Sequence, residues 1–149
     1  MRAYYLGNND SEGAGIDGET LVAEGILHWH LPVDEAAYTA PLNEIRKARG
    51  YVEMDQIHLD PATPNLGALC DKFYAEHHHT DEEIRFVIAG SGIFDLRDED
   101  DAWMRVHLGP GDMIIVPADK HHRFTLDDAR TITCKRLFQD TNGWEAILR

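Results

Sequence analysis

The stretch "EHHHTDEEIRFVIAG", residues 76–90, places three consecutive histidines and two glutamates directly before an apolar run. Successive side chains of a β-strand point to opposite faces, so His77 and His79 share one face of an extended chain and His78 points away. If the strand register is kept through the polar residues that follow, Glu83 rather than the preceding glutamate faces the two histidines. Two imidazoles and a carboxylate form a common site for first-row metals such as iron, nickel, manganese or zinc. The stretch therefore predicts a strand that carries a metal site.

A second pair of histidines follows the apolar run "MIIVP", in the stretch "DKHHRFTL" at residues 119–126. Because another strand is predicted to end just before it, one of its imidazoles could complete the same site. Either cluster taken alone also fits surface histidines and a solvated turn of carboxylates. Their joint presence favours the metal site, whereas His28, His30, His58 and His107 are interpreted as surface histidines or as core histidines with satisfied hydrogen bonds.

Short strand-like segments separated by turn residues fill the chain from Tyr51 onward. In order they are "YVEMDQIHL", "EIRFVIAG", "SGIFDLR", "AWMRVHL", "GPGDMIIVP", "HRFTL" and "TITCKRLF". This regular spacing is typical of an antiparallel sandwich or barrel, so we expect a mainly β fold. Gly90 and Gly92 in "AGSG" predict one tight hairpin, and the glycines of "LGPGD" predict another.

The first part of the chain has a different pattern, which predicts a few short helices. In particular, "APLNEIRKARG" predicts a short amphipathic helix with Pro41 in its first turn, basic residues near its end and Gly50 as its stop. No repeat, low-complexity tract or long linker interrupts the sequence. We therefore expect a single domain over residues 1–149, with a helical preface over about 1–50 and a barrel over about 51–149.

The composition is that of a globular domain, with 43% apolar and 28% charged residues among 149. A chain of this length buries about two-thirds of its unfolded surface without help from a metal, so any bound metal is expected to be functional rather than structural. No segment approaches the roughly 20 apolar residues of a membrane span, and the opening "MRAYYLGNND" lacks a signal-peptide core. We expect a cytoplasmic protein without a membrane partner.

Acidic residues outnumber basic ones by 27 to 14, which gives a net charge of −13. This charge repels a phosphate backbone, so nucleic acid is not expected as a partner. A small anionic substrate is still compatible, because a metal and one or two arginines can dominate the field inside a pocket. Cys70 and Cys134 lack the spacing of zinc or redox motifs and are interpreted as small buried residues without a disulfide. A monomer is expected, with a small homo-oligomer as the alternative.

Both histidine clusters resemble the two sequence motifs of the cupins. The first motif is matched by His77, His79 and Glu83, followed by Gly90, and the second by "GDMIIVPADKHH", which ends at His122. The resemblance implies a cupin double-stranded β-helix, a small jelly-roll-like barrel with the metal inside.

The departures from the general cupin motifs point to one branch of the superfamily. Asp71 stands in place of the leading glycine of the first motif, and Asp119 and Leu126 replace a glycine and an asparagine of the second. The stretches "KFYAEHHHTDEEIRFVIAGSGIFDLRD", "GDMIIVPADKHHRFTLD" and "RLFQDTNGW" closely resemble the acireductone dioxygenase family. "ARGYVEMDQIHLDPATPN" resembles it too, so the similarity extends from about Glu44 onward.

This resemblance implies which residues bind the metal. It gives one Fe²⁺ or Ni²⁺ ion per chain with the ligands His77, His79, Glu83 and His122. His78 and His121 then become neighbours of the site that do not bind the ion.

The resemblance also implies residues that act on the substrate. Arg85 and Arg136 match family arginines beside the substrate and are expected to be catalytic, while Phe86 and Phe124 match aromatic residues of the pocket wall. A simple role in the barrel core is the alternative for the two phenylalanines. Because the sequence ends with "GWEAILR", we expect less cover over the pocket than in longer relatives.

The implied reaction cleaves 1,2-dihydroxy-3-keto-5-methylthiopentene with dioxygen, in methionine salvage. The iron form yields formate and 4-methylthio-2-oxobutanoate, whereas the nickel form yields carbon monoxide, formate and 3-methylthiopropanoate. Two alternatives remain at this point. One is a different metal cupin, such as an isomerase or a dioxygenase of another substrate, and the other is a non-catalytic cupin that binds a small ligand.

Overall fold

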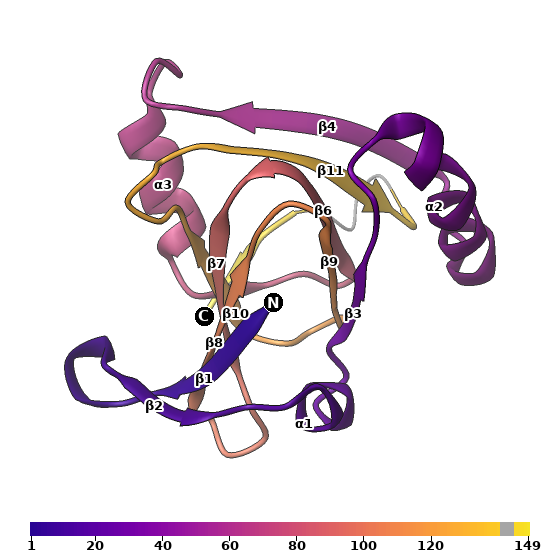
Figure 1. The fold of residues 1–149 in the computed structure, drawn as a ribbon. Coiled ribbons are helices and arrows are strands. Elements are labelled where there is room, and N and C mark those ends of the chain that lie inside the picture. Colours follow the sequence, from indigo (N-terminus) through magenta and orange to yellow (C-terminus); the bar gives the residue numbers. More distant parts are fainter. Residues whose placement is uncertain (141–144) are drawn as a thin grey trace.

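The computed structural model describes residues 1–140 and 145–149, and these residues form two antiparallel sheets and three α-helices (Figure 1). The larger sheet has the strand order β12-β5-β10-β7-β8-β1-β2. Its strands are, in chain order, β1 (Arg2–Leu6), β2 (Glu12–Gly15), β5 (His77–His78), β7 (Gly92–Arg97), β8 (Trp103–Leu108), β10 (His122–Thr125) and β12 (Ile147–Leu148).

The smaller sheet has the strand order β3-β9-β6-β11-β4. Its strands are β3 (Leu27–His30), β4 (Glu53–Leu59), β6 (Glu83–Gly90), β9 (Asp112–Val116) and β11 (Ile132–Phe138). The helices are α1 (Gly18–Ala23), α2 (Glu35–Arg49) and α3 (Leu66–Tyr74), with a 3₁₀ turn over Asn8–Asp10. The mainly β fold and the strands expected from residue 51 onward are confirmed.

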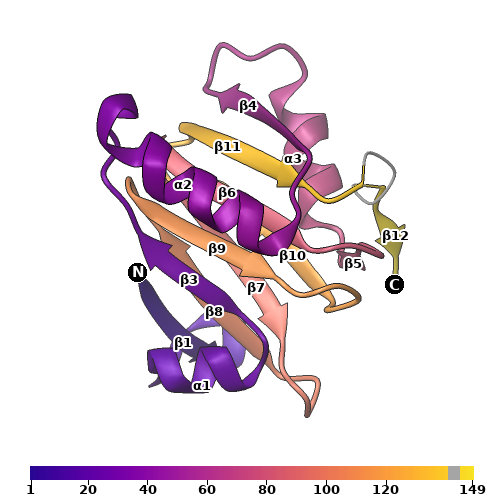
Figure 2. The same ribbon diagram turned by 90° about the vertical axis from the view of Figure 1, so that its right-hand side faces the viewer.

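The main apolar core lies between the two sheets. It contains Val87 and Ile114 from the smaller sheet and Phe94 and Val106 from the larger one, all buried. A second cluster lies on the outer face of the smaller sheet, beneath α2, which crosses that face in Figure 2. Strand β6 is therefore buried on both faces, and it separates the interior of the barrel from the layer under the helix.

The two glycine-rich turns do not form the hairpins predicted from the sequence. Strand β6 pairs with β9 and β11, whereas β7 pairs with β8 and β10, so "AGSG" carries the chain from one sheet to the other. "LGPGD" makes the same crossing between β8 and β9. Gly90 has a φ of +73°, and a Cβ atom there would lie 2.2 Å from the carbonyl oxygen of Thr131. Glycine is needed because the backbone turns sharply against Thr131, just before β11, where the chain passes from one sheet to the other.

The preface also differs from the prediction, because it contributes strands as well as helices. Strands β1 and β2 extend the larger sheet through the pairing of β1 with β8, and β3 extends the smaller sheet through its pairing with β9. These three short strands have mixed polarity and carry little periodic signal of their own, so their pairing depends on the sheet edges that the barrel offers.

Helix α2 begins earlier than predicted. It runs without interruption through Pro41, which was expected in the first turn, and it ends at Gly50 in the left-handed conformation, as predicted. Proline removes one backbone hydrogen bond inside a helix. Burial of Tyr38 and Leu42 against the smaller sheet offsets that cost, since these two side chains flank the proline on the packed face.

Helix α3 was not predicted, although its sequence carries a signal. Leu66, Leu69, Cys70 and Phe73 recur at helical spacing and pack against the interior core. The helix lies against β10, and Figure 1 places it on the opposite side of the barrel from α2. It thereby brings Phe73 to the rim of the barrel interior.

Neither cysteine forms a disulfide within the described residues. Cys134 is buried as expected, whereas Cys70 on α3 is only half-buried. None of the helices in residues 1–140 and 145–149 is long and apolar enough to cross a bilayer.

Candidate metal centre

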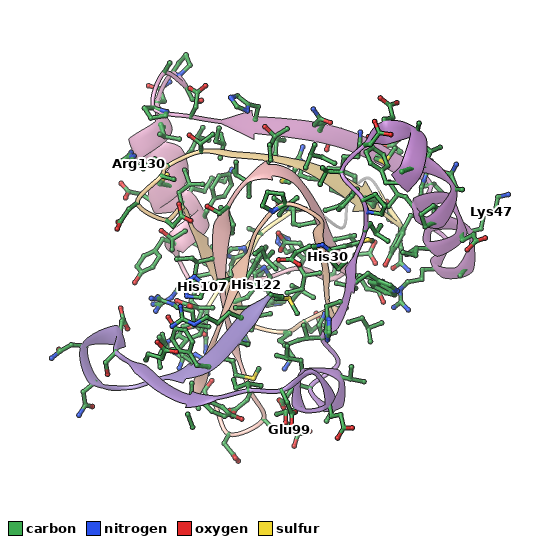
Figure 3. The ribbon with its side chains drawn as sticks, in the orientation of Figure 1. His30, Lys47, Glu99, His107, His122 and Arg130 are labelled. Carbon is green, nitrogen blue, oxygen red and sulfur yellow. The ribbon has the colours of Figure 1, made fainter. Side chains whose placement is uncertain are left out.

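Four polar side chains meet inside the barrel, at the end where β5, β6 and β10 begin. His77 on β5 stands opposite His122 on β10 in the register of the larger sheet, while Glu83 opens β6 in the smaller sheet. His79 lies two residues beyond His77. One ligand atom from each of these four side chains lies within 4.8 Å of the others, and all four side chains are buried. Figure 3 shows His122 in the interior, far from the peripheral side chains of Lys47, Glu99 and Arg130.

The cluster has the composition and arrangement of a site for a divalent cation. The Nε2 atom of His122 lies 2.5 Å from Oε2 of Glu83, and Nε2 of His79 lies 3.1 Å from the same oxygen. The ring centroids of His77 and His122 are 4.5 Å apart. Burying four polar groups in an apolar barrel is unfavourable unless hydrogen bonds or a bound cation compensate for the lost hydration. Three imidazoles and one carboxylate suit iron, nickel, manganese or zinc.

Each of the three imidazoles forms a hydrogen bond to a backbone carbonyl through its Nδ1 atom. A carbonyl oxygen can only accept, so Nδ1 carries the proton and donates, which leaves the lone pair of Nε2 for a metal. The pairs are His77 with Ala75 (2.6 Å), His79 with Glu145 (3.0 Å) and His122 with Lys120 (2.8 Å). The backbone therefore fixes all three rings in the tautomer that a metal ligand needs.

The surroundings shift the pKa values of Glu83 and His77 towards their metal-binding forms, but not that of His79. Burial would lower the pKa of His79, but its hydrogen bond to Glu83 and the charge of Glu83 outweigh burial and raise it. Burial alone would raise the pKa of Glu83, but the charge of Arg85 and the contacts with His122 and His79 outweigh it and hold this pKa well below its usual value. Arg85 contacts Glu83 directly, with 2.8 Å between Nη2 and Oε1. Burial lowers the pKa of His77. An anionic carboxylate and a neutral imidazole are the forms that bind metals.

A cavity of about 400 Å³ opens beside the four ligands. Its polar end is formed by the ligands together with Arg85, which contacts Glu83, and Arg136, which is paired with Arg85 in the strand register. The remaining wall is apolar, and it includes Leu59, Phe73, Val87, Phe94, Leu108, Phe124 and Ile132. The volume and the division into one charged end and one apolar wall are those of a site for a small amphiphilic molecule.

The two arginines expected beside the substrate both line this cavity. Arg85 and Arg136 are neighbours in the register between β6 and β11. Arg85 is held by Glu83, whereas Arg136 binds Asp55 of β4, with 2.8 Å between Nε and Oδ1 and a second contact through Nη2. The structure thus brings both guanidinium groups to the polar end of the cavity, and their action on a substrate stays a prediction.

The two phenylalanines expected in the pocket wall lie in different places. Phe124 lines the cavity and packs against Phe94, with 5.1 Å between the ring centroids. Phe86 lies in the cluster beneath α2, edge-on to Tyr38 at 5.2 Å. The alternation along β6 is the reason, because Arg85 faces the cavity and its neighbour must face outward. Contact between Phe86 and a substrate does not fit this position.

Glu82 lines the cavity, although the sequence argument placed it on the face opposite to the histidine ligands. Strand β5 ends at His78, so residues 79–82 do not keep the strand alternation on which that argument depended. The carboxylate of Glu82 lies at the rim of the cavity, where it accepts hydrogen bonds from Arg49 and Tyr51. Sequence reasoning also missed Phe73 and Lys72, because α3 was not predicted.

His78 and His121 lie beside each other, with their ring centroids 5.0 Å apart. In the described part of the chain they do not belong to the cluster of potential ligands. The stretch "RLFQDTNGW" ends within residues 141–144, which are outside the described residues.

Comparisons with known proteins give a consistent result. Residues 9–146 match the sequence profile of the ARD/ARD′ family. The chain is 40% identical over 149 residues to an acireductone dioxygenase of Heterostelium pallidum, covering all of this chain and 98% of that protein. It is 39% identical to one of Dictyostelium discoideum, covering all of this chain and 99% of that protein. A solved structure, acireductone dioxygenase from Bacillus anthracis with a cadmium ion in its active centre, superposes with a TM-score of 0.87 at 31% identity, covering 99% of this chain and 98% of that one.

Proposed function

The chain belongs to the ARD/ARD′ family, and from this premise we propose that it is a metal-dependent acireductone dioxygenase. The observation that carries the proposal is the convergence of His77, His79, Glu83 and His122 at the charged end of the cavity. We propose these four residues as the ligands of one Fe²⁺ or Ni²⁺ ion. The match to the Bacillus anthracis enzyme supports this assignment, because that enzyme holds a cadmium ion in its active centre.

The proposed substrate is 1,2-dihydroxy-3-keto-5-methylthiopentene, which is cleaved with dioxygen in methionine salvage. When bound, the divalent ion supplies a Lewis acid and a template for an anionic substrate and oxygen. Glu83 is the only anion among the four ligands, so the loaded site keeps one positive charge and favours an enediolate. We further propose that the protein acts in the cytosol as a monomer.

The residues around the ligands would bind and orient the substrate. Arg85 would hold the enediolate oxygens by charge-assisted hydrogen bonds, and Arg136 stands beside it across the sheet. Phe124 and Phe94, from the apolar wall, would contact the methylthio tail and exclude water from the reacting end. The tail and the charged end of the substrate thus match the two ends of the cavity.

A substrate assay under controlled oxygen tests the proposed activity. Under anaerobic conditions, the metal-loaded protein should leave the enediolate absorbance of the acireductone unchanged. On admission of oxygen the absorbance should decay far faster than without protein. Protein stripped of metal by a chelator should lose this activity and regain it on reloading. If no metal-loaded form accelerates the decay, the proposed activity is wrong, and a cupin acting on another substrate takes its place.

Arg85→Ala should lower kcat/KM about ten- to a hundredfold when measured at saturating metal. The lost contact is a hydrogen bond between a guanidinium and an anion, which is worth about 1.5–3 kcal/mol. Arg85→Lys should recover part of the loss, because lysine keeps the charge but not the fork of donors. Steady-state kinetics and metal content are the measurements.

A surface arginine provides the control for this variant. Arg130 is exposed and has a φ of 52°, which asparagine tolerates, so Arg130→Asn should leave kcat/KM unchanged. Kinetics of Arg85→Ala that match those of the control would remove Arg85 from substrate binding.

A further inference from the structure

The three histidine ligands differ in where their supporting carbonyl comes from. His77 and His122 each donate to a carbonyl only two residues earlier in the chain, so their support is local. The carbonyl that accepts from His79 belongs to Glu145, which is 66 residues away. Only one of the three imidazoles thus depends on a remote segment for its orientation.

That remote segment, residues 145–149, is held against β5 mainly by its backbone. Strand β12 pairs with β5, and the N–H of Arg149 donates to the carbonyl of Glu76 at 3.1 Å. Apolar burial contributes little, since the side chains of Ile147 and Leu148 are 41% and 69% exposed. A two-residue strand at the edge of a sheet is weak by itself, so something else must hold the segment in place.

The side chain of Arg149 provides that hold. Its Nη1 atom lies 2.7 Å from a carboxylate oxygen of Glu76 and 2.7 Å from one of Asp101, and Nη2 lies 3.0 Å from the second oxygen of Asp101. Arg97 contacts the same two carboxylates. An isolated surface ion pair contributes little, but a bidentate arginine within a network of charges is the exception.

We propose that Arg149 is a positioning residue of the metal centre, which acts through the backbone of residues 145–149. By anchoring this segment to Glu76 and Asp101, it keeps the carbonyl of Glu145 on Nδ1 of His79 and so holds that imidazole in the tautomer and orientation that a metal requires. The inference rests on the metal site of the proposed function and not on the identity of the substrate. Residues that support a metal ligand in this way typically change metal affinity 10- to 100-fold.

Zinc affinity is the first readout, because Zn²⁺ suits imidazole and carboxylate ligands and needs no substrate. Arg149→Ala should weaken Zn²⁺ binding roughly 10- to 100-fold in competition with a chelator of known affinity. Arg149→Lys should restore part of the affinity. Arg2→Ala is the matched control, since Arg2 forms an exposed ion pair with Glu12 on the far edge of the larger sheet, and it should leave the affinity unchanged.

Imidazole NMR of the zinc-loaded protein is the second readout, and it separates positioning from general loosening. The wild type should show three slowly exchanging Nδ1–H protons. Arg149→Ala should accelerate exchange of the proton of His79 alone, while those of His77 and His122 stay protected. Asp101→Asn removes the negative charge and one acceptor oxygen from a partner of Arg149, in an exposed turn whose left-handed backbone asparagine tolerates. It should give the same selective change at smaller size.

Unchanged zinc affinity in Arg149→Ala, or equal acceleration of all three protons, would overturn the proposal. Failure of the acireductone assay would leave these readouts intact, because neither uses the substrate. Conversely, an active dioxygenase with an unaltered His79 proton in Arg149→Ala would reject the positioning role while keeping the proposed function.

Discussion

Replacing His122 by alanine should lower the affinity for a divalent metal more than about 100-fold and abolish turnover. The change removes one of four ligands from a buried cluster, and it leaves Glu83 without the imidazole that lies 2.5 Å away. Loss of a group that merely supports a ligand already costs 10- to 100-fold, so loss of the ligand itself must cost more. Metal content after dialysis and the dissociation constant measured by chelator competition are the tests. Alanine at His77, His79 or Glu83 should have the same effect.

The chain supplies its own controls for this prediction. His78 and His121 each stand next to a proposed ligand in sequence, yet their rings pack against each other outside the cluster. His78→Ala and His121→Ala should therefore retain nearly full metal content. If His78→Ala lost as much metal as His122→Ala, the assignment of the ligands would fail.

Exchange of the metal, without any change in sequence, should change the site of cleavage and hence the products, with formate common to both product sets. Three imidazoles and a carboxylate accept iron and nickel alike, so the same protein can be loaded with either. The iron-loaded protein should release formate and 4-methylthio-2-oxobutanoate. The nickel-loaded protein should release carbon monoxide, formate and 3-methylthiopropanoate. Gas chromatography detects the carbon monoxide, and NMR identifies the acids.

Samples for this experiment come from one preparation that is stripped with a chelator and then divided. The stripped portion serves as the control and should give neither product set above the uncatalysed background. One product set from both loaded samples would show that the metal does not select the site of cleavage in this protein.

The barrel strands and the shared face of His77 and His79 could be predicted because their signals are local, whereas Glu83 and His122 were selected by the resemblance to a known family. Alternation along a strand is a property of consecutive residues, and it separates His77 and His79 from His78 without knowledge of the rest of the fold. The same rule, continued along β6, shows that Phe86 must face away from Arg85. Alternation along the strand therefore places Phe86 outside the cavity, whereas the resemblance implied that it lines the pocket wall.

Other features could not be predicted because they depend on partners distant in the chain. The glycine turn at Gly90 has the composition of a hairpin, and only the pairing of its two strands with different sheets shows that it is a crossing. The carbonyl of Glu145 is a backbone group, so no residue type marks it as the partner of His79. Pro41 was assigned to a helix start because proline is common there, but packing of α2 extended the helix past it.

The crossing turns of the barrel also determine when the metal centre can form during folding. Strands β6 and β7 follow each other in the chain but lie in different sheets, and β11 pairs with β4 so that Thr133 stands opposite His58. Pairings between such distant segments close large loops and make folding slow. His77, His79 and Glu83 lie within seven residues of one another, whereas His122 reaches them only through the pairing of β10 with β5. The complete set of four ligands therefore forms only after this long-range pairing, although three of the ligands are already close in the chain.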